Sequence, residues 1–289
     1  MIRNILTACL LLAGAGNASA ALERISLKEG MANGTLEVKA WANGNGYHNK
    51  SLHMEITNTG AKAIQVEIDQ ALIFRPVDTG YQDFVLAGTD LVVVKGKGTM
   101  IVEEQVFCGK SHAAAPSRNL TFQFLKQGDE QLVKVMTFIN QKKLYDNLGQ
   151  DAVWALTNRH ELNGVFDPAR PDLSRELLAY MSKVTGWPIP EYYKLYAHNA
   201  RGAGPVAEPK ALKMLALFDW KLEAPKTLTL GIYNKDGRMV QPVVENKEFG
   251  RGGHRVRVEF EAEGAETGMY YIRLMDGAAV MKETAVKVD

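Results

Sequence analysis

Cysteine is scarce in this chain, which has only two among its 289 residues, Cys9 and Cys108. So few cysteines exclude a fold held together by several disulfides. An excess of charge of one sign is also lacking, because 34 basic and 33 acidic side chains give a formal net charge of +1. No overall field would therefore gather nucleic acid or anionic lipid. Because basic runs with interleaved aromatic residues are missing too, we expect no nucleic-acid partner.

The motifs of common hydrolases and metalloenzymes are missing as well. Residues 159–162, RHEL, begin like the helix of zinc proteases, but Gly164 stands where the second histidine is required. The sequence has no Gly-x-Ser-x-Gly nucleophile elbow. A blue-copper site around Cys108 and His112 would usually include an axial methionine, and none follows His112 closely. We expect a protein that is not an enzyme and that holds no metal or other cofactor.

The first 20 residues have the pattern of a signal peptide. Arg3 provides a positive start, residues 5–13 are apolar, and residues 18–20, Ala-Ser-Ala, form a small-residue cleavage site. Cleavage after Ala20 removes Cys9 and leaves Cys108 as a single thiol. No later segment has the length of a membrane span. The sequence predicts an exported protein without a transmembrane segment, extracellular or on the cell surface, with the periplasm as the alternative.

Alternation of polar and apolar residues predicts strands up to about residue 125. It is clear in residues 36–41, 52–56 and 63–68. Residues 91–94 and 100–102 flank Lys95–Gly98, which we interpret as a hairpin turn. Closely spaced strands with polar turns are typical of an antiparallel sandwich or barrel.

The period of the apolar residues changes further along the chain. Helical spacing covers about 129–186, and a Gly/Ala/Pro-rich stretch then indicates a linker, which we place at 201–222. Residues 223–289 return to short strands, typical of an Ig-like sandwich. The sequence thus predicts a mainly β protein with a helical subregion. Its parts are a signal peptide (1–20), a β-rich domain with helices (21–200), a linker (201–222) and an Ig-like β-sandwich (223–289).

The C-terminal part carries three runs that resemble known domains: YNKDGRMV from residue 233, GGHRVRVEF from 252 and TGMYYIRLMDGAAVMKETAVKV from 267. They resemble the C-terminal sorting domain of type IX secretion cargo, and equally the Ig-like domain of flagellar hook-capping proteins. The Asn-Pro-Ala element that often opens such sorting domains is replaced by residues 223–225, Glu-Ala-Pro. The sorting resemblance implies contact with secretion machinery, passage through an outer membrane and removal of this domain. A plain accessory sandwich is the alternative.

Cys108 has a candidate partner in Gln150, within LGQDAVWALT. Phe107-Cys108 together with residues 148–154 resemble the motifs of bacterial thioester domains, which are surface-adhesin modules. In that family a cysteine at a strand end condenses with a glutamine at a helix start. The resemblance covers about residues 90–160, with a shorter insert between the motifs. It implies an internal Cys108–Gln150 thioester that acylates an amine on a protein or glycan partner at the cell surface.

The chemistry of such a bond assigns supporting roles to nearby residues. The attacking thiolate needs positive charge, from Lys110 or His112, and backbone N–H groups at the helix start for the developing oxyanion. Phe107 and Trp154 would exclude water, and His112 or His160 would act as base. The alternative is a structural or carbohydrate-binding β-sandwich protein whose cysteine is buried and inert.

Overall fold

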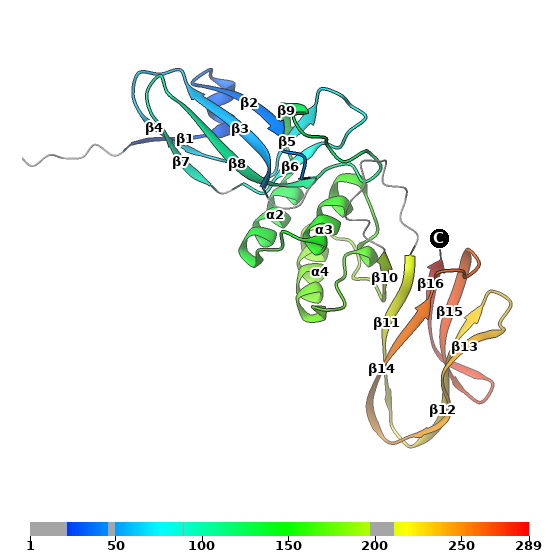
Figure 1. Ribbon diagram of the computed structural model, residues 1–289. Coiled ribbons are helices and arrows are strands. Elements are labelled where there is room, and N and C mark those ends of the chain that lie inside the picture. The colour runs from blue at the N-terminus through cyan, green and yellow to red at the C-terminus, as the bar shows by residue number, and fades with distance from the viewer. Residues whose placement is uncertain (1–21, 46–49, 89, 197–210, 289) are drawn as a thin grey trace, which may run out of the picture.

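The computed structural model describes residues 22–45, 50–88, 90–196 and 211–288. They form a β-barrel, a group of helices and a β-sandwich, which follow one another along an elongated molecule (Figure 1). The expected mainly β fold with a helical subregion is confirmed. The predicted signal peptide, residues 1–20, lies outside the described residues. Across the described ranges, no helix has both the length and the apolar character needed to cross a membrane.

Six strands of the described N-terminal part close into a barrel in which neighbours run antiparallel. Ala40 pairs with Met54, and Met54 pairs with Val102, so these apolar side chains face the interior together. In order around the barrel, the strands are β2 (Leu36–Ala42), β3 (Lys50–Asn58), β8 (Thr99–Cys108), β6 (Phe84–Leu86), β5 (Leu72–Pro76) and β9 (Thr121–Gln127).

A small sheet belongs to the same core as the barrel, because Ile25, Val66 and Val94 are buried in the cluster that fills the barrel. β4 is its central strand and pairs parallel with β1 and antiparallel with β7. The elements are β1 (Glu23–Ser26), α1 (Leu27–Ala32), β4 (Ile64–Glu67) and β7 (Leu91–Val94).

The prediction of a hairpin at Lys95–Gly98 is wrong, because the two flanking strands pair with other strands and not with each other. β7 pairs with β4, whereas β8 pairs with β3 and β6. The turn packs instead on another turn: a Cβ on Gly96 would lie 1.9 Å from the Ala61 carbonyl oxygen. The Lys97 N–H also donates to the Gly60 carbonyl over 2.8 Å. This segment therefore carries the chain from one sheet to the other.

The helices that follow β9 lie between the barrel and the sandwich, within the range where helices were expected (Figure 1), whereas the short α1 was not predicted. The helix that starts at Glu130 has the usual N-cap, in which the Asp129 side chain accepts the Leu132 N–H over 2.8 Å. Gly186, at a φ of 76°, ends the last helix. The elements are α2 (Glu130–Lys142), α3 (Asn147–Asn158), the 3-10 turn η1 (Leu162–Gly164) and α4 (Pro171–Thr185).

In the described C-terminal part, sheets of three and four strands form a sandwich with the strand order of Ig-like domains. The Tyr270 hydroxyl donates to the Glu266 carbonyl over 3.1 Å near the start of β15, which reproduces the tyrosine corner of such domains. One sheet has the order β10 (Tyr192–Tyr196), β11 (Ala211–Leu222), β14 (Gly252–Glu261). The other has the order β13 (Met239–Phe249), β12 (Lys226–Asn234), β15 (Gly268–Asp276), β16 (Ala279–Val288).

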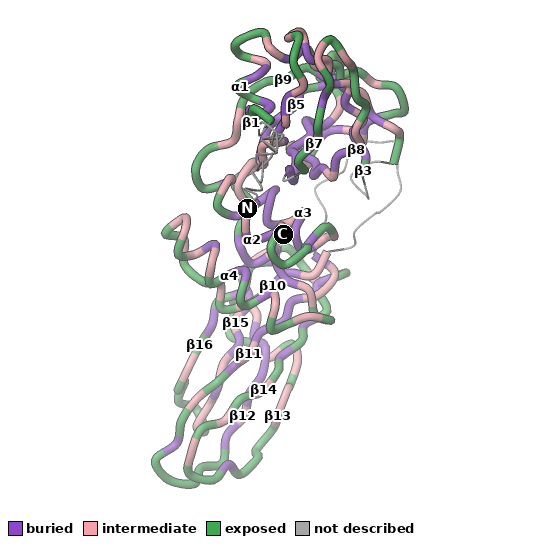
Figure 2. The backbone as a smooth tube through the Cα atoms, turned by 90° about the vertical axis from the view of Figure 1, so that its left-hand side faces the viewer, coloured by how far each residue is buried: buried purple, intermediate pink, exposed green. Residues whose placement is uncertain are grey.

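The sandwich begins earlier in the chain than the sequence indicated. Residues 211–222, expected to end the linker, form β11, and β10 lies within the range assigned to the first domain. β10 pairs with β11 inside the sandwich sheet, but Tyr193 of β10 also stacks on Phe166 with ring centroids 3.9 Å apart. Leu215 of β11 joins the same buried cluster as the helices. The buried part of the chain continues from barrel to helices to sandwich (Figure 2).

Candidate functional site

Cys108 is the last residue of β8 and is fully buried. It pairs with Phe84 of β6 and belongs to the buried cluster that fills the barrel. Trp154 of α3 belongs to the same cluster. Burial raises the pKa of the Cys108 thiol well above its ordinary value, because the surroundings disfavour the charged thiolate. The resting thiol is therefore neutral.

Gln150 lies in the first turn of α3 and is fully buried as well. Its side-chain amide makes two reciprocal hydrogen bonds to the main chain of Cys108. The Cys108 N–H donates to Gln150 Oε1 over 2.9 Å, and Gln150 Nε2 donates to the Cys108 carbonyl over 2.9 Å. The structure thus brings together the two residues that the sequence paired.

This pairing occupies the edge of β8 that β3 leaves free. The register of β3 with β8 ends where Lys50 pairs with Gln105. At Cys108, the Gln150 amide supplies the donor and the acceptor that a neighbouring strand would supply. Because both bonds go to one residue, the carboxamide lies flat against the Cys108 backbone. The carboxamide therefore adjoins the residue that carries the thiol.

Gly149 allows α3 to approach β8 this closely. A Cβ at this position would lie 1.9 Å from the Leu144 carbonyl oxygen and 3.2 Å from Cε1 of Phe107. Real Cβ atoms do not approach backbone oxygens so closely, so a side chain would push the helix start away. The glycine before Gln150 in LGQ therefore has a packing role that the sequence analysis did not assign.

A second amide of α3 holds the segment that follows Cys108. Asn158 Nδ2 donates to the Gly109 carbonyl over 3.0 Å, and the Ser111 N–H donates to Asn158 Oδ1 over 3.2 Å. Gln150, Trp154 and Asn158 are spaced four residues apart and share one helix face. This face runs along residues 108–111, so α3 is bonded to that segment at both ends.

The two histidines proposed as bases do not lie at the Gln150 amide. The His160 ring nitrogen Nε2 contacts Ser111 Oγ at 2.9 Å, and its ring lies 6.4 Å from that of Trp154. The eight residues from Gln150 to Asn158 rise about 12 Å along a helix, so His160 is near the opposite end of α3. His112 is exposed. Residue type and nearness in sequence suggested that these histidines act as bases, but the fold does not place them at the Gln150 amide.

Lys110, which was expected to supply positive charge to the thiolate, forms an ion pair with Asp83 instead. Lys110 Nζ lies 3.0 Å from Asp83 Oδ1, and Arg75 lies 3.2 Å from the other carboxylate oxygen. Asp83 also accepts the Gly109 N–H at its backbone carbonyl over 2.7 Å. This cluster anchors the loop after Cys108 rather than stabilising a thiolate.

The two aromatic residues proposed as shields have different positions. Phe107 is buried among the helices and points to the opposite side of β8 from Cys108, as successive strand residues do. Trp154 is buried in the cluster that contains Cys108. Trp154 therefore covers the thiol side, and Phe107 covers the first turn of α3.

Comparison with protein families, curated proteins and solved structures finds no match for this chain. Among the residues that the structure describes, no three His, Cys, Asp or Glu side chains are grouped closely enough to hold a metal. The Cys108–Gln150 pair is the candidate site that this geometry supports.

Proposed function

We propose that this is an exported, non-enzymatic surface protein in which Cys108 and Gln150 form an internal thioester that acylates an amine of a partner. The observation that carries the proposal is the pair of reciprocal 2.9 Å hydrogen bonds that holds the Gln150 carboxamide against Cys108. Holding a reacting group beside the residue that carries its partner contributes strongly to the rate of a condensation.

The reaction balances within the chain. Cys108 Sγ attacks the Gln150 carboxamide carbon, the C–N bond breaks, and the thiol proton leaves with the nitrogen as ammonia. The product is an acyl thioester. A partner amine then attacks the same carbon, giving an amide bond to the partner and returning the proton to Cys108.

Burial affects the two steps in opposite directions. It disfavours a thiolate, which slows formation of the bond. The same burial keeps water away and makes the thiolate a poor leaving group, which protects the bond once it has formed. A buried site is therefore suited to a bond that forms once and persists until a partner reaches it.

A structural role for the pair is the second candidate, because one observation favours it directly. The Gln150 amide completes the edge of β8 where β3 ends, and this alone would give a buried glutamine a function. Under this reading Cys108 is an inert core residue and no ammonia is lost.

Peptide mapping distinguishes the two candidates. Trypsin places Cys108 in residues 98–110 and Gln150 in residues 144–159. A thioester joins these peptides, at a mass lower than their sum by one ammonia. Methylamine treatment before digestion should instead give N-methylglutamine at position 150 and an alkylatable Cys108. Two unmodified peptides from protein that was never exposed to amines would refute the thioester.

Matched variants sharpen the result. Cys108→Ala and Gln150→Glu should each abolish the joined peptide, because one lacks the nucleophile and the other has no ammonia to lose. Asn158→Asp changes the other amide of α3 that bonds to the same segment. It should leave the joined peptide in place.

Export and sorting rest on the N-terminal signal pattern and on the C-terminal resemblance. Mass measurement of the protein recovered from the medium and from cell fractions tests both. We expect a mature N-terminus at Ala21. Protein retaining residues 1–20 in the cytoplasm would contradict export, and an intact sandwich on the secreted form would contradict its removal.

A further inference from the structure

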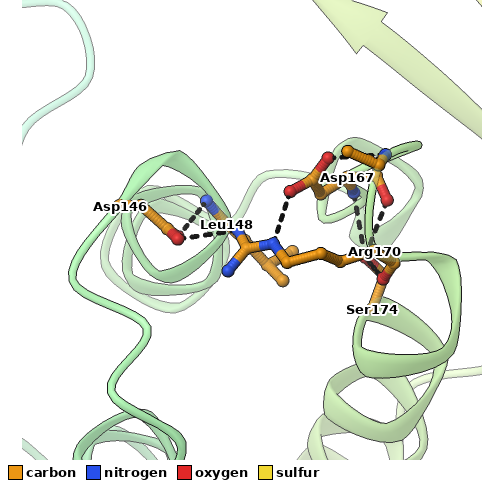
Figure 3. Close-up of polar contacts among 6 residues, drawn as sticks. Asp146, Leu148, Asp167, Arg170 and Ser174 are labelled. Atoms are coloured by element: carbon orange, nitrogen blue, oxygen red, sulfur yellow. Dashed lines mark hydrogen bonds and ion pairs between the residues drawn. The ribbon is translucent and has the colours of Figure 1, made fainter.

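We infer that Arg170 is a positioning residue for Gln150, because it ties the start of α3, which carries Gln150, to the start of α4. The inference rests on the proposed thioester and adds a residue that sets its geometry. Figure 3 shows the arrangement, with the Arg170 guanidinium lying between Asp146 and Asp167.

On one side, Arg170 holds the residue that caps α3. Its Nη2 lies 2.7 Å from Asp146 Oδ2. The other Asp146 carboxylate oxygen accepts the Leu148 N–H over 3.1 Å, and the Asp146 carbonyl accepts the Gln150 N–H over 2.9 Å. Asp146 therefore fixes the first turn of α3, including the backbone of Gln150, and Arg170 fixes Asp146.

On the other side, Arg170 is anchored to α4. Its Nε donates to Asp167 Oδ2 over 2.7 Å, and the Asp167 N–H donates to Oγ of the fully buried Ser174 over 2.9 Å. Partial burial opposes ionisation of Asp167, but hydrogen bonds from Arg170 and from the Ala169 N–H hold its pKa below the ordinary value. The guanidinium thus joins a carboxylate at each helix start.

This link is suited to positioning more than to stability. The Arg170 and Asp146 side chains are 38% and 42% exposed, and ion pairs at such exposure contribute little to folding. Reaction rate is far more sensitive, because a displacement of about 1 Å between reacting groups costs about 100-fold. Loss of Arg170 should therefore slow thioester formation much more than it lowers the melting temperature.

The kinetic experiment uses full-length chains recovered unfolded, with Gln150 intact, and then refolded. The fraction of residues 144–159 trapped by methylamine is followed with time. We expect Arg170→Ala to form the thioester at least about 10-fold more slowly, with a melting temperature lower by no more than about 4 °C. Asp146→Asn keeps a capping oxygen but loses the ion pair, and should behave in the same way. The double variant should be no slower than either single variant.

Arg175→Ala is the matched control. Arg175 lies on α4 five residues after Arg170, is similarly exposed and pairs with Asp172, but this pair does not involve α3. Its refolding should give thioester at the wild-type rate. Equal rates for Arg170→Ala and wild type, or equal slowing in Arg170→Ala and Arg175→Ala, would overturn the inference.

A second readout does not depend on the reaction. The Gln150 amide bonds to the main chain of Cys108, so Cys108→Ala retains both hydrogen bonds while removing the thiol. In this background, NMR should show slow solvent exchange of the Gln150 side-chain amide protons, and adding Arg170→Ala should speed that exchange at least about 10-fold. Unchanged exchange contradicts the positioning role. Absence of thioester in the wild type, with faster exchange in Arg170→Ala, contradicts only the proposed function.

Discussion

Replacing Glu104 with glutamine should remove a large pH dependence of stability. Glu104 lies on β8 and is only 2% exposed, and its Oε1 atom has no hydrogen-bond partner among the described residues. Burial raises the pKa of this carboxyl from 4.5 to about 8, with Asp90 raising it further and Lys50 opposing. A charge at this position is therefore costly in the folded state.

The direction and size of the effect follow from linkage. Below about pH 4.5, Glu104 is protonated in both states and imposes no penalty. As the pH rises towards about 8, the unfolded chain loses the proton and the folded chain retains it, so the wild type is destabilised by about 1.4 kcal/mol per pH unit. The total destabilisation of the folded wild type reaches about 5 kcal/mol near pH 8 and stays constant above that pH. This is a large share of an ordinary folding free energy, about 5–15 kcal/mol.

Urea unfolding at pH 5, 6, 7 and 8, followed by tryptophan fluorescence, measures this difference. Glu104→Gln should match the wild type within about 1 kcal/mol at pH 5 and exceed its stability by several kcal/mol at pH 8. Glu103→Gln, on the neighbouring exposed carboxylate, is the matched control and should follow the wild-type curve. If the Glu104→Gln and wild-type curves run parallel from pH 5 to 8, the argument from burial is refuted.

Two further predictions concern packing. Gly149→Ala should lower the free energy of unfolding by about 3 kcal/mol and speed solvent exchange of the Gln150 side-chain amide, because the new Cβ would collide with the Leu144 carbonyl oxygen. Urea unfolding measures the first effect and NMR the second. A variant as stable as the wild type would contradict this prediction. Cutting the chain at a protease site introduced within residues 197–210 should leave the two fragments together in gel filtration. The reason is that β10 stays paired with β11 and Tyr193 stays in the helical core. Separation of the fragments would show that these contacts do not hold the sandwich.

Local polarity predicted the individual strands well, because β2, β3 and β4 each have one buried and one more exposed face. It did not predict their partners. Lys95–Gly98 has the composition of a hairpin turn, but its glycine is needed where two turns touch, as Gly96 against Ala61 shows. Turn composition reports local backbone conformation and says nothing of which strands pair.

The missed start of the sandwich has a different cause. β11 is covered on both faces, since Leu215 packs towards the helices while Met214 and Phe218 pack inside the sandwich. A strand buried on both sides loses the alternation that identifies a strand from sequence. Covering of this kind depends on elements far away in the chain, so no local pattern could place the boundary.

Glu104 left a signal in the sequence that could have been used. Side chains alternate along β8, so Glu104 falls on the same side as Val106 and Cys108. The run Glu103–Gln105 inside an otherwise apolar strand must then send one polar group inwards. The pattern predicts a buried acid, although its pKa requires the surroundings of the folded protein.

For the Cys108–Gln150 pair, the sequence motifs predicted the contact but not the residues that surround it. The motifs suggested which two residues meet, and the hydrogen bonds place them in contact. The supporting residues followed from type and nearness alone, and here the fold differs: Lys110 is bound to Asp83, and His160 lies at the opposite end of α3. The proposed condensation then depends on how closely the Gln150 amide is held to Cys108. The determinants of reactivity should therefore be the groups that hold α3 against β8, which are glycine and ion-pair contacts with no catalytic signature in the sequence.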